Sequence, residues 1–170
     1  DETADMDLVV PAIVFGAVGT AGQRCTSTRR VIVHQSAFEE LKKRLVDAYK
    51  QVKIGDPLEI NTLMGPLINK RAVESFSRAI NDAVKNGGEV IHGGVVTSGP
   101  GNFVTPAIIV AENKWDIVQA ETFAPILYII KYQSLDEAIS MHNDVPQGLS
   151  SSMFTTKINN AEKFLSSSGS

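Results

Sequence analysis

The amino-acid sequence predicts an α/β fold in which helices flank a largely parallel sheet. Three runs of aliphatic and β-branched residues, at 31–34, 89–94 and 125–132, have the composition of buried strands. Amphipathic helical patterns alternate with these runs, and such alternation is typical of a sheet with mostly parallel strands. A length of 170 residues with 43% apolar residues suffices for one domain with an enclosed core.

The first predicted element is a buried helix. Residues 8–18 are almost continuously apolar, with small residues among them, and the pattern ends in the glycine-rich loop 19–22. The glycines Gly16, Gly19 and Gly22 do not have the spacing of the dinucleotide-binding pattern GxGxxG. We therefore interpret them as residues of close helix packing and of a turn.

A strand and a second helix follow. The run VIVH at 31–34 is predicted to be a short buried strand. Ser36 and Glu39 have the spacing of a capping box, which predicts the start of a helix near Phe38. This helix ends before Asp56 and Pro57 at the latest. Its apolar residues recur at helical spacing and are Leu41, Leu45, Ala48, Tyr49 and Val52.

The middle of the chain is predicted to contain a helix and two strands. The helix spans about 70–86, and Gly87 with Gly88 terminates it. The run EVIHGG at 89–94 is predicted to be a strand closed by a turn. The apolar run 103–112 contains Pro106, which favours an edge or irregular strand in its first half.

The last part of the chain contains the most regular predicted strand, PILYIIKY at 125–132. Ser134 and Glu137 again have capping-box spacing and predict a short helix after it. Residues 149–156 alternate weakly as a strand would. A final helix is predicted from about Asn159.

Composition excludes several classes of function. A formal net charge of −3 and an isoelectric point near 5.6 leave no basic face for phosphate contacts, which argues against nucleic-acid binding. No apolar run approaches the ~20 residues that span a bilayer, and the acidic start is unlike a signal peptide. A single cysteine cannot form an intramolecular disulfide, so we expect a reducing, cytoplasmic environment. The three histidines, His34, His92 and His142, lack metal-ligand spacing, and we expect no metal site.

Two interpretations of that cysteine, Cys25, are open. A lone cysteine is most often a small buried hydrophobic residue. Cys25, however, lies in a polar, glycine-flanked loop between a predicted helix and a predicted strand, where a side chain can reach a cleft. The nearby Arg24, Arg29 or Arg30 would favour the thiolate, which is the form that attacks carbonyl carbons.

Four segments resemble the aldehyde dehydrogenase superfamily. GTAGQRCTSTRRVIVH at 19–34 resembles its cysteine segment, and ETFAPILYIIKY at 121–132 resembles its second signature. TLMGPLI at 62–68 and NDVPQGLSSSMFT at 143–155 fall in place as well, so the resemblance covers essentially the whole chain. Ala124, where most relatives have glycine, makes the chain similar to the antiquitin type, whose members act on α-aminoadipic semialdehyde.

The resemblance implies a role for each of four residues. Cys25 would be the nucleophile that forms a thiohemiacetal with the aldehyde and then a thioester after hydride transfer to the nicotinamide. Its own backbone N–H would form half of an oxyanion hole. Glu121 would hold the ribose hydroxyls of the nicotinamide half, and Phe123 would pack near the ring. Arg24 would bind a distal carboxylate of the substrate. Without the resemblance, Glu121 would be a solvated loop charge, Phe123 a core aromatic residue and Arg24 a surface arginine.

The resemblance further implies that residues 1–170 form most of a Rossmann-like catalytic domain, truncated at both ends. NAD, with NADP as the alternative, would be bound mainly by a domain outside the chain, and the general base, a glutamate, would lie just upstream of Asp1. A small aldehyde is then the substrate, and the parent protein is expected to be a homo-oligomer, a dimer or a tetramer. The isolated chain is expected to lack turnover. The alternative is a non-catalytic folding or association module. A cysteine hydrolase is disfavoured, because no histidine partner is identifiable and the local sequence fits no protease signature.

Overall fold

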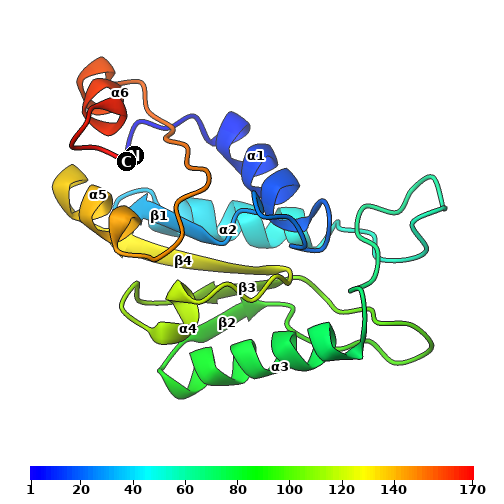
Figure 1. The fold of residues 1–170 in the computed structure, drawn as a ribbon. Helices are drawn as coiled ribbons and strands as arrows, with labels where there is room; N and C mark the ends of the chain where they lie inside the picture. Colours follow the sequence, from blue (N-terminus) through cyan, green and yellow to red (C-terminus); the bar gives the residue numbers. More distant parts are fainter.

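A four-stranded sheet forms the centre of the computed structural model, which describes all residues from 1 to 170 (Figure 1). The strands are β1 (Arg30–His34), β2 (Glu89–His92), β3 (Ala107–Val110) and β4 (Ile126–Tyr132), in the order β1-β4-β3-β2. Both β1 and β3 pair with β4 in parallel, whereas β2 pairs with β3 antiparallel. The predicted α/β fold with a largely parallel, helix-flanked sheet is therefore confirmed.

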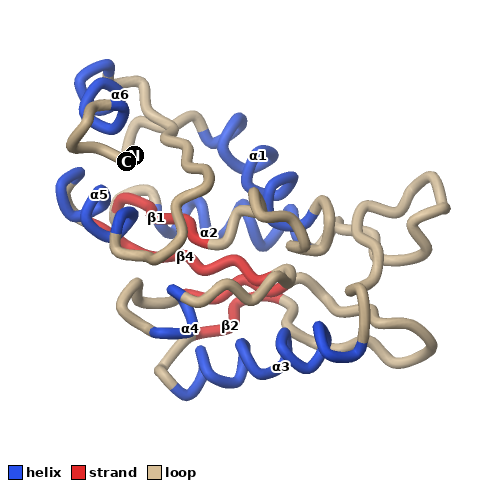
Figure 2. Tube along the Cα trace, viewed as in Figure 1, coloured by secondary structure: helices blue, strands red, loops and turns tan.

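Six helices surround this sheet (Figure 2). In Figure 1, α3 runs beside β2, an edge strand of the sheet, and α1 packs against α2, which also contacts β2. The short α4 was not predicted, because one turn of helix carries no periodicity. No helix combines the length and the apolar character needed to cross a membrane. The helices are α1 (Met6–Val18), α2 (Phe38–Tyr49), α3 (Lys70–Lys85), α4 (Asp116–Gln119), α5 (Leu135–Asn143) and α6 (Ile158–Leu165).

The core is built around β4. Every residue of this strand is buried except Lys131, as expected for a parallel strand that is covered on both faces. The helix α3 packs on the sheet through an apolar stripe with i, i+3, i+4, i+7 spacing. This stripe consists of Phe76, Ala79, Ile80 and Ala83. The apolar stripe of α3 and the buried strand β4, both predicted from their periodicities, thus contribute to the same core.

The predicted capping box at the start of α2 is wrong. The N-cap residue is Ala37, and no side chain caps the helix. The hydroxyl of Ser36 instead pairs with His34 Nδ1 at 2.8 Å, and the backbone N–H of Ser36 donates to the same nitrogen. The imidazole of His34 therefore binds the hydroxyl that was expected to cap the helix. The second predicted cap is confirmed, since Ser134 Oγ accepts a hydrogen bond from the backbone N–H of Glu137 at 3.3 Å in α5.

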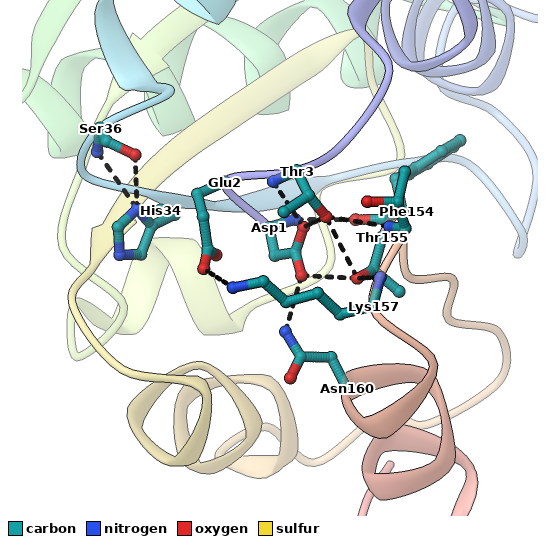
Figure 3. Close-up of polar contacts among 10 residues, drawn as sticks. Asp1, Glu2, Thr3, His34, Ser36, Phe154, Thr155, Lys157 and Asn160 are labelled. Carbon is teal, nitrogen blue, oxygen red and sulfur yellow. Dashed lines mark hydrogen bonds and ion pairs between the residues drawn. The ribbon is translucent and has the colours of Figure 1, made fainter.

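The predicted strand at 149–156 is also wrong, because these residues form no regular element. The segment crosses the N-terminal residues and bonds to them instead (Figure 3). The amino group of Asp1 donates to the carbonyl of Phe154 at 2.8 Å, and Thr155 Oγ1 donates to the Asp1 carboxylate at 2.6 Å. Polar groups of this segment thus form hydrogen bonds with the N-terminal residues instead of with a neighbouring strand.

Truncation of Phe76 should test the core directly. Phe76 is fully buried, so Phe76→Ala is expected to lower the free energy of unfolding by about 3–5 kcal/mol, through lost burial and a residual cavity. Val84→Ala on the exposed side of the same helix should change it by less than about 0.5 kcal/mol. Urea unfolding followed by the fluorescence of Trp115 measures both. Equal effects of the two substitutions would contradict the packing described here.

Candidate active site

Cys25 lies at the tip of a tight turn formed by residues 24–27. The backbone N–H of Ser27 donates to the carbonyl of Arg24 at 3.0 Å, and the N–H of Arg24 donates to Ser27 Oγ at 3.1 Å. These two bonds close the turn from both sides and place the free thiol of Cys25 in solvent. We call residues 22–29, which contain this turn, the nucleophile loop.

The backbone N–H of Cys25 is available for a ligand. As the second residue of the turn, Cys25 has an N–H that points away from the closing hydrogen bond, and no acceptor in the chain engages it. An unpaired N–H next to a thiol can stabilise negative charge on an oxygen bonded to the carbon that the sulfur attacks. The turn therefore supplies a nucleophile and one hydrogen-bond donor at the same point.

Two other segments hold the nucleophile loop in place. The backbone N–H of Thr28 donates to the carbonyl of Gly16 in α1 at 3.0 Å, and a Cβ added at Gly16 would lie 2.3 Å from Thr28 Oγ1. The Gln23 amide donates to the carbonyl of Pro66 at 3.3 Å and accepts from the N–H of Ile68 at 2.8 Å. The segment 62–68, which sequence reasoning singled out only by resemblance, thus fixes the position of the loop.

Glu121 and Phe123 lie on the loop between α4 and β4, residues 120–124, which we call the carboxylate loop. Both residues are exposed, and Phe123 is 42% exposed. Phe123 also has a φ of 59°, in the left-handed region that bulky residues rarely adopt. Strained conformations of this kind persist where the surroundings require them, often at functional sites. The ring is therefore presented to solvent instead of being buried in the core.

The two loops are in direct contact. Gly22 has a φ of 67°, and a Cβ at this position would lie 2.2 Å from the carbonyl oxygen of Ala124. Cys25 and Glu121 line one groove of about 750 Å³, which also borders β1. Arg24 and Phe123 line a much smaller neighbouring pocket, together with Glu121. The structure thus gathers the four residues singled out from the sequence around the contact between these loops.

The three arginines near Cys25 have different environments. Arg24 is exposed on the turn. Arg30 points away from it and donates to the carbonyls of Met141 and His142, at 2.8 and 2.9 Å, and to Asn113 Oδ1 at 2.6 Å. Those carbonyls belong to the last turn of α5, so Arg30 satisfies groups that a helix C-terminus leaves unpaired. Burial and the charge of Arg29 lower the pKa of Arg30.

Arg29 and Tyr128 are site residues that the sequence reasoning did not assign. Both line the small pocket, and Arg29 also lines the groove that contains Cys25. Arg29 was considered only as a charge near the thiol. Tyr128 has the sequence signal of a core strand residue, and nothing in that signal reveals that its hydroxyl lies beside a loop.

The histidines form no cluster, although His142 lines the far part of the groove that contains Cys25. His92 packs edge-on against Tyr49, and His142 lies near Phe164 with Arg30 close by. Burial lowers the pKa of both imidazoles. No three histidine, cysteine, aspartate or glutamate side chains come together in a way that could hold a metal ion.

Fold and site together define the class of the protein: an α/β domain with a site centred on an exposed thiol. The chain belongs to the aldehyde dehydrogenase family, whose model matches residues 1–168. An aldehyde dehydrogenase family 7 member A1 homologue of Caenorhabditis elegans is 49% identical over 100% of this chain and 33% of its own length. The α-aminoadipic semialdehyde dehydrogenase of Mus musculus is 48% identical over 99% of this chain and 32% of its own length.

Solved structures agree with this assignment. Lactaldehyde dehydrogenase from Escherichia coli superposes with a TM-score of 0.92 at 37% identity, over 95% of this chain and 34% of that one. Betaine aldehyde dehydrogenase from Staphylococcus aureus, in complex with NAD+, gives a TM-score of 0.91 at 28% identity, over 95% of this chain and 33% of that one. The family resemblance predicted from the motifs is confirmed. The chain spans about a third of the length of these relatives.

The contact between the two loops should be testable at Gly22. Gly22→Ala combines a strained φ with a clash against the carbonyl of Ala124, so we expect a loss of more than about 3 kcal/mol of unfolding free energy. Gly87→Ala is the matched control, since Gly87 also has a positive φ, 96°, but no atom within 4 Å of an added Cβ. It should lose only about 1–2 kcal/mol. Urea unfolding of both variants measures the difference, and similar losses would contradict a close approach at Gly22.

Proposed function

We propose that this chain is the thiol-bearing catalytic domain of an NAD(P)-dependent aldehyde dehydrogenase, which oxidises an aldehyde to a carboxylate. The observation that supports this most is the exposed Cys25 thiol, on a turn whose own N–H is free, in the same groove as Glu121. Membership of the aldehyde dehydrogenase family supports the reaction class. As a proposal, residues 1–170 form one domain of a longer, cytoplasmic, oligomeric enzyme.

The first chemical step follows from the turn. The Cys25 thiolate adds to the carbonyl carbon of the aldehyde, a carbon–sulfur bond forms, and the carbonyl π electrons move to the oxygen. The negative charge that develops on this oxygen is stabilised by the backbone N–H of Cys25, which is already oriented and needs no rearrangement. An exposed thiol at the tip of a turn leaves room for the substrate on this side.

The carboxylate loop fits the nicotinamide half of the cofactor. The Glu121 carboxylate is exposed and can accept hydrogen bonds from two neighbouring hydroxyls, as a ribose presents them. The exposed ring of Phe123 offers an apolar surface beside it. When bound, the nicotinamide supplies the hydride acceptor. The structure of betaine aldehyde dehydrogenase from Staphylococcus aureus, which matches 95% of this chain, is a complex with NAD+. This similarity supports the same cofactor here.

We propose α-aminoadipic semialdehyde as the substrate. The relative from Mus musculus carries this name, and Arg24 offers matching chemistry next to the nucleophile. Arg24 is exposed and immediately precedes Cys25 in the turn. Its planar guanidinium can bind a carboxylate through two parallel hydrogen bonds, so it suits a substrate with a carboxylate at the far end.

The second candidate function is a folding or association module without chemistry. Several exposed apolar side chains favour it, among them Phe15, Ile60 and Leu165, because such surfaces are often covered in a larger assembly. The rate of Cys25 alkylation by iodoacetamide discriminates the two. A rate faster in the folded chain than in denaturant supports an activated thiol, and a slower one supports the module.

Replacement of the nucleophile should abolish the reaction. In the intact enzyme, Cys25→Ser is expected to lower kcat for aldehyde oxidation by at least about 1,000-fold, because a hydroxyl is a far weaker nucleophile at neutral pH. Thr26→Ser, at the neighbouring exposed position, should retain most of the activity. Formation of NADH, followed by its absorbance, measures both variants. Substantial turnover by Cys25→Ser would refute the assignment.

Glu121→Gln should separate cofactor binding from thiol chemistry. The amide retains the shape of the side chain but loses the charge and one acceptor oxygen. We expect KM for the nicotinamide cofactor to rise about tenfold, equivalent to ~1.4 kcal/mol, with an unchanged rate of Cys25 alkylation in the cofactor-free enzyme. An unchanged KM, or a slower alkylation, would argue that Glu121 does not bind the cofactor.

A further inference from the structure

Arg29 lies where three segments of the chain meet. It follows the turn that carries Cys25 and immediately precedes β1. Its Nη2 donates a hydrogen bond to Gln147 Oε1 at 3.1 Å, across 118 positions of sequence. Its side chain also lines both the groove that contains Cys25 and the small pocket beside the carboxylate loop. A single guanidinium thus borders the nucleophile loop, the carboxylate loop and the segment around Gln147.

Two buried polar atoms next to this pocket have no partner among the protein atoms. They are Arg29 Nη1 and the hydroxyl oxygen of Tyr128, a residue that is only 2% exposed. Native proteins pair nearly all such groups, either with protein atoms or with ordered water. Arg30, by comparison, makes three hydrogen bonds with protein acceptors. The unpaired atoms are therefore specific to the wall of the small pocket.

The hydroxyl of Tyr128 lies between the two loops. Burial raises the pKa of Tyr128 to about 12, so the hydroxyl is protonated at neutral pH and can both donate and accept. The charge of Arg29 and the hydroxyl of Thr122 act in the opposite direction, by stabilising the ionised form. The Thr122 hydroxyl lies close enough to interact with the Tyr128 oxygen but forms no well-aligned hydrogen bond with it, so the proton of the Tyr128 hydroxyl has no protein acceptor. Arg29 belongs to the nucleophile loop and Thr122 to the carboxylate loop. Both loops therefore approach the same hydroxyl.

The pocket has the size of one water molecule. Its volume of about 10 Å³ is close to the smallest space that holds a water, and far too small for a carboxylate or a phosphate. A guanidinium can only donate, whereas a water can accept from Arg29 and exchange a second hydrogen bond with the Tyr128 hydroxyl. A single water within hydrogen-bond distance of both atoms would therefore satisfy both of them at once.

We propose that one water molecule bridges Arg29 Nη1 and the Tyr128 hydroxyl, and that Arg29 is thereby a positioning residue that holds the nucleophile loop against the carboxylate loop. The existence of the bridge depends only on the folded chain. Its effect on catalysis rests on the proposed function. In this arrangement Arg29 acts through the relative placement of Cys25 and Glu121.

The test uses the intact enzyme with the variants Arg29→Met, Tyr128→Phe and their combination. Each single variant removes one end of the bridge and keeps most of the side-chain volume. We expect each to raise KM for the nicotinamide cofactor about 3- to 10-fold with a smaller change in kcat, and to alter the rate of Cys25 alkylation by iodoacetamide in the cofactor-free enzyme. The double variant should be no worse than the more impaired single variant, because the two residues share one bridge.

Tyr49→Phe is the matched control, since it removes another buried tyrosine hydroxyl, one that packs against His92 away from the site. It should leave KM and the alkylation rate unchanged. Thermal unfolding of every variant separates loss of fold from loss of positioning. Effects of Arg29→Met and Tyr128→Phe that multiply in the double variant, or variants that change only the unfolding temperature, would overturn the proposal.

A crystal structure of the intact enzyme gives a readout independent of activity. Density for one water within hydrogen-bond distance of both atoms supports the bridge, and its absence refutes it. If the wild-type enzyme oxidises no aldehyde but the water is present, the proposed function fails and the bridge stands. If the wild-type enzyme is active and the variants match it, the positioning role fails and the proposed function stands.

Discussion

The parallel pairing of β1 with β4 is the constraint on which the candidate site depends. The nucleophile loop leads directly into β1, and the carboxylate loop leads directly into β4. Because the two strands are neighbours that run in the same direction, their amino ends lie at one edge of the sheet, and so do both loops. Two residues far apart in sequence, Cys25 and Glu121, are thereby brought to one groove. Ligands of open α/β sheets commonly bind at the carboxyl ends of the strands, whereas the two loops of the candidate site lie at the amino ends of β1 and β4.

Sheet topology brings the loops near one another, but glycine sets how closely they approach. At Gly22 and at Gly16, an added Cβ would overlap the carboxylate loop and the nucleophile loop, respectively. These glycines were predicted to serve packing and turns instead of phosphate binding, and their environments agree with that interpretation. Any side chain at Gly22 would push the carboxylate loop away from the nucleophile loop. The separation between thiol and carboxylate is thus controlled by residues that carry no chemistry.

Elements with a strong local signal were predictable from the sequence. The buried strand β4, the amphipathic α3 and the Ser134 cap of α5 follow from periodicity and from capping chemistry within a few residues. The errors arose where a distant or competing partner decided the outcome. The hydroxyl of Ser36 forms a hydrogen bond with the imidazole of His34 instead of capping a helix. The segment that was expected to form a strand is hydrogen-bonded to the N-terminal residues. The site residues were found by resemblance to family motifs, whereas the contacts that arrange them, such as Gln23 to Ile68, have no local sequence signal.

The three arginines near Cys25 lie close together in sequence, but their guanidinium groups have different environments. Arg30 donates hydrogen bonds to the last carbonyls of α5, so its guanidinium is held in place inside the fold. Arg24 is exposed on the turn that carries Cys25. Arg29 lies between these extremes, with one nitrogen bonded to Gln147 and the other buried against Tyr128. Because each guanidinium has a different environment, we expect different consequences of losing one: a weakened end of α5 for Arg30 and, under the proposals above, altered loop placement for Arg29 and weaker substrate binding for Arg24. Sequence proximity to a nucleophile therefore says little about which cation acts on it, and the direction of each side chain decides the matter.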